Sequence, residues 1–395
     1  MNHSTELKVT KFEAPQGLKA ATYASLVIGL ISFVLGFIKN PERMWTSYLT
    51  AFFFFAGIAS CALFFIAFSY ASKAGWNVTI RRFAEGMTNY FPVMLVTSLV
   101  LIVGFKSLYA WAVPETMETL TGGKQVFLAP WFVVLRLIIF GLGSIYFGKL
   151  IVGNSLKQDQ SGNPELTNQN LRNSIGYIAF FAIFFSLLSI DLLMSLLPTW
   201  YSTIYGIYCF AGALQAMFAL LAIIVVCMKN SPWIKGYVND EHQHDVGKFL
   251  KGFSVFWAYI AFSQFMLIWY ANIPEETEFY ITRSLNGWMS ISFALLIFRF
   301  IVPFLVLLPR GSKRSNSILV FTSIMVLVMH YIDIYWLVYP NFFDGELRFG
   351  FWEIGIFLGF AGLFSMTMIQ FLSKNSLVPT NDPRLHEALA HHVTY

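Results

Sequence analysis

Four charged or titratable side chains lie inside long apolar stretches of this sequence: Arg136, Asp191, His330 and Asp333. A charge that faces lipid near the middle of a bilayer costs roughly 2.5–3.5 kcal/mol on insertion scales. We therefore expect these groups to point into a helix bundle, where partners stabilise them. Carboxylates and imidazole are also the groups of proton relays, because their pKa values can be moved into the working range.

The positions of these residues along their stretches predict their depths in the membrane. Asp191 lies about 17 residues into its stretch, roughly 25 Å from the cytoplasmic start at ~1.5 Å per residue, and Asp333 lies at a similar height. His330 precedes Asp333 by one helical turn on the same face, and Arg136 lies near the midplane. We expect all four to converge in one polar cluster in the outer half of a bundle.

On the inner half, Glu85 and Arg299 are the charged candidates. Together with the outer cluster they suggest two polar half-channels that meet near the midplane. The alternative is a set of buried ion pairs, for instance Arg136 with an aspartate, that only fix helix packing. Three further charged residues near the ends of their stretches are expected to extend to the membrane interface: Lys106, Arg283 and Glu353.

The sequence argues against several cofactor sites. A haem held by two histidines needs both at matched depths, and only His330 lies in an apolar stretch. The three cysteines lack the spacing of an iron–sulfur or zinc site: Cys61, Cys209 and Cys227. The segment 240–245, with two histidines and three acidic residues, is interpreted as a solvated acidic loop rather than a metal site. Nucleotide-binding and nucleophile-elbow motifs are missing. We expect a chain that binds no cofactor itself.

The composition predicts an all-α polytopic membrane protein in which residues 1–395 form one integral membrane domain. Hydrophobic residues make up 57% of the chain and charged residues only 12%, about half the charge of a soluble protein. Ten stretches exceed the roughly 20 residues that span a bilayer: 19–38, 47–72, 83–113, 126–151, 173–197, 200–228, 248–272, 279–308, 317–339 and 350–373.

The basic residues predict the orientation. If the N-terminus is inside, the inner loops and tails carry 18 of the Lys and Arg residues counted, and the outer loops carry four. This asymmetry predicts cytoplasmic tails at 1–18 and 374–395. The net charge of +5 does not indicate nucleic-acid binding, because the basic residues cluster in the loops on one side.

Two prolines inside apolar stretches predict helix kinks. Pro92 and Pro303 each lack the N–H that would bond the carbonyl one turn earlier. Kinks beside Glu85 and Arg299 would make room for water, and ordinary packing kinks explain the prolines equally well.

Four segments carry a resemblance to a known family: 74–87, 252–277, 299–315 and 329–340. They resemble the NrfD/PsrC-like family of quinone-interacting membrane subunits, and more narrowly the smaller of the two NrfD-like subunits of alternative complex III. The resemblance implies ten helices, with four-helix bundles built from spans 2–5 and 6–9 and two peripheral helices. It also implies a place in the inner membrane of a bacterium.

The resemblance further implies a multi-subunit quinol:electron-acceptor oxidoreductase. The expected partners are a larger NrfD-like subunit, an iron–sulfur/molybdopterin-like peripheral subunit and multihaem and monohaem cytochrome c subunits, so that haem c and iron–sulfur clusters belong to other chains. In such complexes the smaller subunit is a candidate proton conductor. The residues that fit here are Glu85, Arg136, Asp191, His330 and Asp333. A self-standing secondary transporter and a purely structural anchor are the alternatives.

Overall fold

The computed structural model describes residues 11–120 and 122–392, and within them the chain is all-α, without a strand. Ten helical segments of this part are long and apolar enough to cross a membrane, which confirms the predicted fold class. They are α1 (Gln16–Lys39), α2 (Pro41–Ala71), α3 with α4 (Val78–Thr88, Phe91–Val103), α8 (Pro130–Ser161), α9 with η2 (Glu165–Leu192, Met194–Leu196), α10 (Tyr205–Lys229), α11 (Asp240–Ala271), α13 with η3 and α14 (Trp288–Ala294, Leu295–Ile301, Val302–Val306), α16 with η4 (Asn316–Val338, Tyr339–Asn341) and α17 (Phe351–Lys374).

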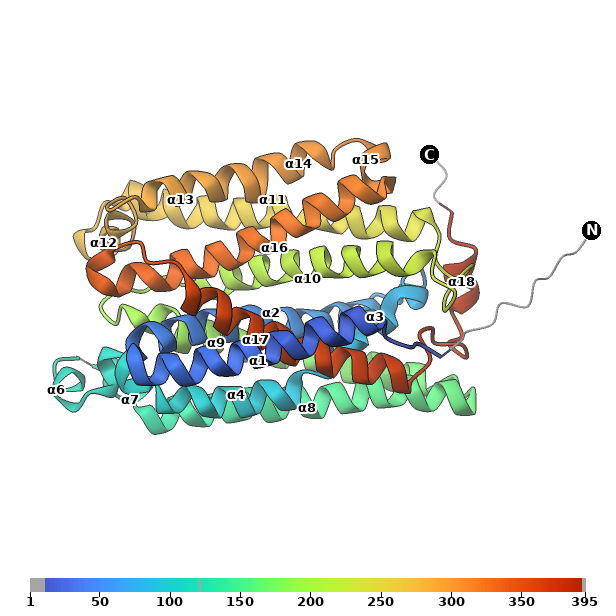
Figure 1. Cartoon of the computed structure of the whole chain (residues 1–395), viewed down its shortest axis with the longest axis horizontal. Coiled ribbons are helices and arrows are strands. Elements are labelled where there is room, and N and C mark those ends of the chain that lie inside the picture. The colour runs from blue at the N-terminus through green and yellow to red at the C-terminus, as the bar shows by residue number, and fades with distance from the viewer. Residues whose placement is uncertain (1–10, 121, 393–395) are drawn as a thin grey trace, which may run out of the picture.

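Short helices connect or end these segments. They are α5 (Phe105–Leu108), η1 (Ala110–Ala112), α6 (Pro114–Met117), α7 (Gly123–Phe127), α12 (Pro274–Thr282), α15 (Arg310–Arg314), η5 (Phe343–Gly345) and α18 (Leu385–Leu389). The described parts of both termini lead to the same end of the molecule (Figure 1), which we name the terminal side.

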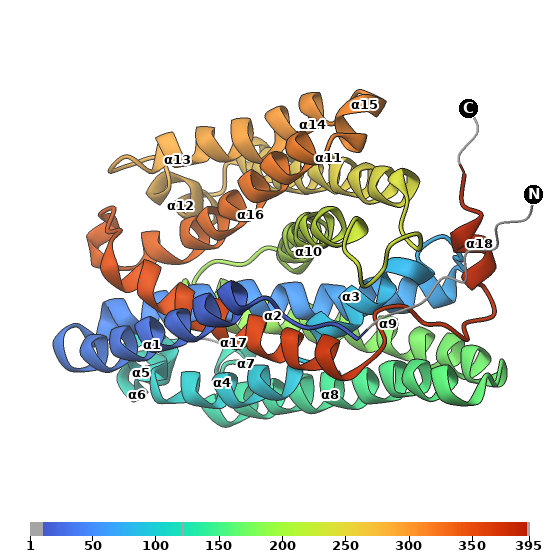
Figure 2. The same cartoon turned by 45° about the vertical axis from the view of Figure 1, so that its right-hand side comes forward.

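The long helices form two four-helix bundles. In the N-terminal bundle α2 packs on α9, α9 on α8 and α8 on α4, with α3 also against α2. In the C-terminal bundle α10 packs on α11 and α16, and η3 lies between α11 and α16. Figure 2 shows the second bundle above the first, with α10 beside α2. The expected grouping of spans 2–5 and 6–9 is thus confirmed.

The first and last spans pair with each other outside the bundles. α1 and α17 approach so closely that a Cβ atom on Gly29 would lie 2.1 Å from the Cα atom of Gly359. One turn away, a Cβ on Gly355 would lie 2.0 Å from the Ser32 hydroxyl oxygen. Small residues allow such contact between helices in a membrane, where van der Waals packing replaces the hydrophobic effect.

Both predicted proline kinks coincide with helix irregularities. The third span breaks at Asn89 and Tyr90, directly before Pro92 in the first turn of α4. The eighth span contains the π-helix η3 just before Pro303. This span was expected to run unbroken over 279–308, and that was wrong. α12 ends at Thr282, and α13 begins only after Gly287, whose φ of +87° suits glycine.

The seventh span begins eight residues earlier than expected. The Asn239 side chain accepts hydrogen bonds from the backbone N–H groups of Glu241 and His242, and so caps α11. Residues 240–247 are therefore helical. Their polar side chains had suggested a loop, because a capping residue and an acidic first turn leave no apolar periodicity at a helix start.

Candidate functional site

A buried polar network lies within the C-terminal bundle, and Arg299 is at its centre. Its Nη1 atom forms an ion pair with Asp333 Oδ2 at 2.6 Å. Its Nη2 atom lies 2.9 Å from His330 Nδ1, and its Nε donates to Gln215 Oε1 at 3.0 Å. The Tyr208 hydroxyl donates to Asp333. We call Tyr208, Gln215, Arg299, His330 and Asp333 the central network; each of them is at most 4% exposed.

Proline chemistry positions the arginine. Pro303 has no N–H, so the Arg299 carbonyl loses its partner in the helix. The Gln215 side-chain amide donates to this carbonyl at 3.1 Å and to the Ser254 hydroxyl at 2.9 Å. Gln215 thus holds both the backbone and the side chain of Arg299. The surrounding turn is π-helical, a local geometry frequent at functional sites.

A glycine on α10 makes room for the guanidinium group. A Cβ atom at Gly212 would lie 2.7 Å from Arg299 Nη2 and 3.5 Å from two atoms of the His330 ring. The ring of Trp257, with its centroid 4.4 Å from Arg299 Cζ, covers another side of the same group. The cation–π contact adds to the ion pair in a region without water-exposed surface.

The hydrogen bonds determine the tautomer of His330. Arginine can only donate, so the Nδ1 atom that faces Arg299 accepts, and the proton of a neutral ring is on Nε2. The Nε2 atom is buried and makes no hydrogen bond within the part of the chain that the structure describes. The ring of Phe54 lies 5.1 Å away, centroid to centroid. A buried donor without a partner is uncommon and marks a place for water or for exchange of a partner.

Arg136 and Asp191 form a separate site in the N-terminal bundle. The Nε and Nη2 atoms of Arg136 contact the two carboxylate oxygens of Asp191 at 2.7 and 2.8 Å. Nη2 also donates to the Phe127 carbonyl at 2.7 Å. The rings of Phe127 and Phe132 each lie 4.3 Å from Arg136 Cζ. We call Arg136 and Asp191 the outer pair.

The prediction of one cluster from four residues is therefore wrong. His330 and Asp333 belong to the central network, whereas Arg136 and Asp191 contact each other between α8 and α9. Arg299, expected in the inner half apart from Asp333, is instead its direct partner. A count of residues gives depth along a helix, but it does not tell which bundle a side chain faces or how far the helix tilts.

Glu85 lies in a third group, toward the terminal side, which we call the inner cluster: Arg81, Arg82, Glu85, Asp159 and Asp382. Arg82 Nη1 lies 2.5 Å from Glu85 Oε2, and Arg82 Nη2 lies 2.5 Å from Asp159 Oδ2. Arg81 Nε is 3.5 Å from Glu85 Oε1, and Arg81 also bonds Asp382. The Ser155 hydroxyl donates to Glu85 at 2.9 Å.

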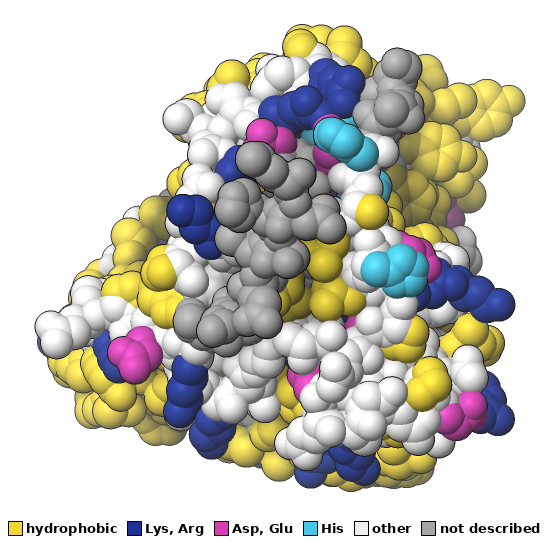
Figure 3. Space-filling model, turned by 90° about the vertical axis from the view of Figure 1, so that its right-hand side faces the viewer, with side chains coloured by type: hydrophobic (Ala, Val, Ile, Leu, Met, Phe, Trp, Pro, Cys, Tyr) yellow, Lys and Arg dark blue, Asp and Glu magenta, His cyan; other side chains and the backbone are white. Residues whose placement is uncertain are grey.

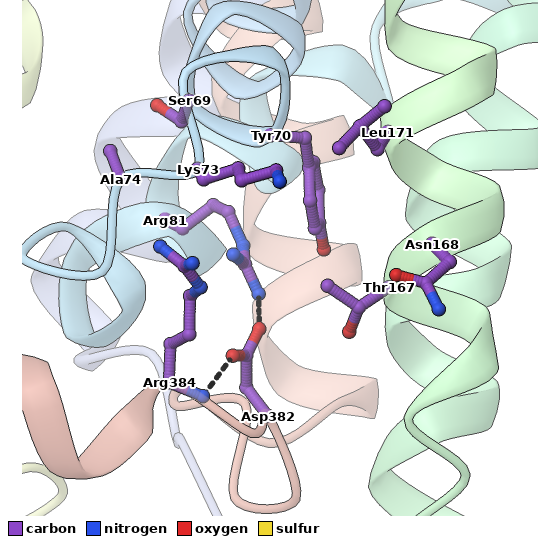
Figure 4. Close-up of a pocket in the computed structure, with 10 residues that line it drawn as sticks. All are labelled: Ser69, Tyr70, Lys73, Ala74, Arg81, Thr167, Asn168, Leu171, Asp382 and Arg384. Atoms are coloured by element: carbon purple, nitrogen blue, oxygen red, sulfur yellow. Dashed lines mark hydrogen bonds and ion pairs between the residues drawn. The ribbon is translucent and has the colours of Figure 1, made fainter.

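A small pocket leads to the inner cluster. It has a volume of about 170 Å³, and Arg81 and Asp382 line it together with Tyr70 and Lys73. Figure 4 shows the Arg81 and Asp382 side chains facing each other across it, with the Arg384 N–H on the other carboxylate oxygen. Arg81 and Arg82 were expected only among the 18 basic residues of the inner loops and tails, and Asp159 and Asp382 were not expected at a site. The i, i+3 and i, i+4 spacing of the arginines with Glu85 was the available signal.

Two of the three residues expected to extend to the interface are buried instead. Arg283 donates to the carbonyls of Trp336 and Leu337 at 3.0 and 2.8 Å. Pro340 cannot bond the Trp336 carbonyl, so this arginine closes the end of α16. Burial lowers the pKa of Arg283 to about 10. Glu353 binds Arg43 through both carboxylate oxygens, at 2.7 and 2.8 Å. Lys106 is exposed.

The segment 240–245 is not a solvated loop. His242 and His244 are buried in the first turns of α11, Glu241 pairs with Arg314, and Asp245 lies 2.6 Å from His391 Nε2. In the described residues no three His, Cys, Asp or Glu side chains are placed to hold a metal ion. Figure 3 views this terminal side, where Lys and Arg side chains lie around the edge and apolar side chains cover the flanks.

No family model matches this chain, and no curated protein matches it significantly. The resemblance to the NrfD/PsrC-like family therefore stays a prediction.

Proposed function

We propose that this chain is a proton-conducting membrane subunit of a respiratory quinol:electron-acceptor oxidoreductase of the alternative complex III type. The observation that carries the proposal is the central network. It places a carboxylate, a phenol, an imidazole and a guanidinium in mutual contact within a membrane-spanning bundle. Ionisable groups inside a membrane are costly and typically belong to ion or proton paths.

The contacts suggest how a proton would pass. Asp333 accepts a proton and loses the attraction of Arg299, which keeps the acceptor atoms of His330 and Gln215. The Tyr208 hydroxyl, bonded to Asp333, can donate on one side and accept on the other. The neutral His330 ring, with its free Nε2, would exchange a proton with water beyond Phe54. In this proposal the inner cluster and its pocket receive protons from the terminal side.

The partners and the orientation complete the proposal. The chain binds no cofactor and works with a larger NrfD-like subunit, an iron–sulfur/molybdopterin-like subunit and multihaem and monohaem cytochrome c subunits. Quinol is the substrate of that complex, and lipids surround this chain in the inner membrane of a bacterium. Both termini are cytoplasmic, as the excess of Lys and Arg near the terminal side favours. A reporter fused after Tyr395 that works only in the periplasm would contradict this orientation.

Membership of the complex is tested by purification. We expect the tagged chain, extracted from native membranes in mild detergent, to bring haem c and iron–sulfur proteins with it in constant ratio. A preparation that is free of such proteins and transports a solute in vesicles would instead support the secondary transporter.

Proton conduction is tested by a matched pair of variants, Asp333→Asn and Asp191→Asn. Asparagine keeps the shape and some hydrogen bonds of aspartate but carries no proton at neutral pH. With the complex in proteoliposomes, electron-transfer rate and internal pH are measured together. We expect Asp333→Asn to assemble, oxidise quinol and move fewer protons per electron, and Asp191→Asn to keep the wild-type ratio in whatever amount assembles. A wild-type ratio in assembled Asp333→Asn rules out a relay through Asp333 and leaves a structural anchor.

A further inference from the structure

An apolar groove of about 680 Å³ follows the seam between the two bundles. Its walls come mainly from α2, α10, α16 and α17, and Phe12, Leu18 and Phe349 complete the lining. Most lining side chains are Phe, Leu, Ile, Val or Met, and oxygen-bearing side chains come only from Tyr331, Glu353 and Ser365 in the described part of the lining. Glu353 is already engaged by Arg43 and Tyr339. The groove therefore offers a partner a hydrocarbon wall with few polar atoms.

The dimensions of the groove limit its occupant. α17 contributes a residue at every turn from Glu353 to Leu372, a distance of about 28 Å at 1.5 Å per residue. This length matches the ~30 Å hydrocarbon core of a bilayer. An almost wholly apolar lining over this length suits the hydrocarbon of a membrane lipid, which brings no polar groups that the groove would leave unsatisfied.

One polar group in the wall lacks a partner. The Tyr331 hydroxyl is buried and makes no hydrogen bond with any described residue. It lies in the outer third of α16, about 10 Å below Val338 at the helix end, counting 1.5 Å per residue. A buried hydroxyl without a partner costs free energy, which an acceptor brought by a ligand would recover.

We propose that this groove holds one acyl chain of a membrane phospholipid, with an ester carbonyl accepting the hydrogen bond of Tyr331. The chain would lie against Phe54, the ring that separates the groove from His330. It would thereby seal the seam between the bundles and cover the side of the central network nearest the groove. This inference does not depend on the proposed function, because it rests on the shape and chemistry of the groove alone.

The experiment compares lipid retained by the full-length protein after exhaustive detergent exchange, measured by native mass spectrometry and by lipid extraction. Ala361→Phe places a ring in the groove, and Ala182→Phe makes the same change on an exposed face of α9. We expect wild type and Ala182→Phe to retain about one phospholipid per chain and Ala361→Phe to retain none. Phosphatidylethanolamine added back should restore the thermal stability of stripped wild type but not that of Ala361→Phe.

A smaller change tests the groove in case Ala361→Phe fails to fold. Tyr331→Phe removes only the unpartnered hydroxyl and should weaken retention about fivefold, the value of one ordinary hydrogen bond. Equal retention by wild type, Ala361→Phe and Ala182→Phe would overturn the proposal. So would a quinone as the retained molecule, because the groove would then hold a redox substrate.

Discussion

The two bundles each bury an arginine–aspartate pair, and the pairs differ in what surrounds them. In the outer pair Arg136 has Asp191, a backbone carbonyl and two phenylalanine rings as neighbours. In the central network the guanidinium group of Arg299 contacts the side chains of Asp333, His330 and Gln215. The first arrangement joins α8 and α9 through a single carboxylate, whereas the second adds an imidazole and a phenol to its carboxylate.

The comparison shows why a buried ion pair alone says little about function. A bidentate pair closed by aromatic rings needs no role beyond packing, since removal of either charge would leave the other unpaired. The outer pair does leave Arg136 Nη1 without a hydrogen bond in the described structure, but no titratable group other than Asp191 bonds it. At Arg299 the hydrogen bonds run on to an imidazole and, through Asp333, to a phenol. These further contacts set the two pairs apart.

The largest effect is expected from Arg299→Ala. The change leaves Asp333 buried without a cation and also removes a bond from His330 and from Gln215. Losing one partner of a buried pair costs about 3–5 kcal/mol of folding free energy, so this variant should accumulate poorly and melt early in detergent. The double variant Arg299→Ala/Asp333→Ala should recover much of the loss, because no charge is stranded. An unchanged melting temperature in the single variant would show that the pair contributes no stability.

A smaller effect separates the two aspartates. In Asp191→Asn, Arg136 keeps the Phe127 carbonyl and gains a neutral amide in place of the carboxylate. In Asp333→Asn, Arg299 likewise faces a neutral amide, but it keeps two side-chain acceptors, on His330 and Gln215. We therefore expect Asp191→Asn to lose about 3 kcal/mol and Asp333→Asn to lose less. Thermal or denaturant unfolding in one detergent measures both. If Asp333→Asn proves the more destabilising, the central network is primarily structural and the comparison fails.

Much of this architecture follows from the sequence, and the pairing of the charges does not. Span length and the 3.6-residue period depend on local composition, so the ten helices and both proline irregularities could be predicted. Asp333 and Arg299 were assigned to opposite halves because the count assumed straight helices normal to the membrane. α16 lies obliquely to α10 (Figure 1), and the π-helix and the break before α13 change the register of the eighth span.

The partners of the inner cluster show the same limit. Glu85 could be selected because it lies in an apolar context, but Asp159 and Asp382 come from the end of α8 and from the C-terminal segment. Contacts between residues about 75 and 300 positions apart depend on how whole helices pack, and no local pattern encodes them. The spacing of Arg81 and Arg82 with Glu85 was visible, since such pairs form on any helix.

Gly212→Ala is expected to lower the free energy of unfolding by less than the loss of a buried charge does, but by more than the loss of one hydrogen bond. The new methyl group would lie 2.7 Å from Arg299 Nη2, so the guanidinium must move away from His330 or Asp333. Overpacking of this kind costs about 1–3 kcal/mol. Gly153→Ala, in α8 with open space around it, is the control and should stabilise its helix by up to about 1 kcal/mol. Equal melting temperatures in the two variants would mean that Arg299 has more freedom than its contacts indicate.

The smallest effect, and the sharpest test of the comparison, comes from two tyrosines. The Tyr208 hydroxyl donates to the carboxylate of Asp333, and the Tyr109 hydroxyl donates to the Leu192 carbonyl beside Asp191 at 2.9 Å. A hydrogen bond to a charged group contributes about 1.5 kcal/mol or more, and one to a carbonyl about 1 kcal/mol. Tyr208→Phe and Tyr109→Phe should thus differ little in stability. They should differ clearly in proteoliposomes, where only Tyr208→Phe should slow proton movement relative to electron transfer, because only that hydroxyl contacts a group proposed to carry a proton. The same proton-to-electron ratio in both variants would remove Tyr208 from the path and reduce the two buried pairs to one kind.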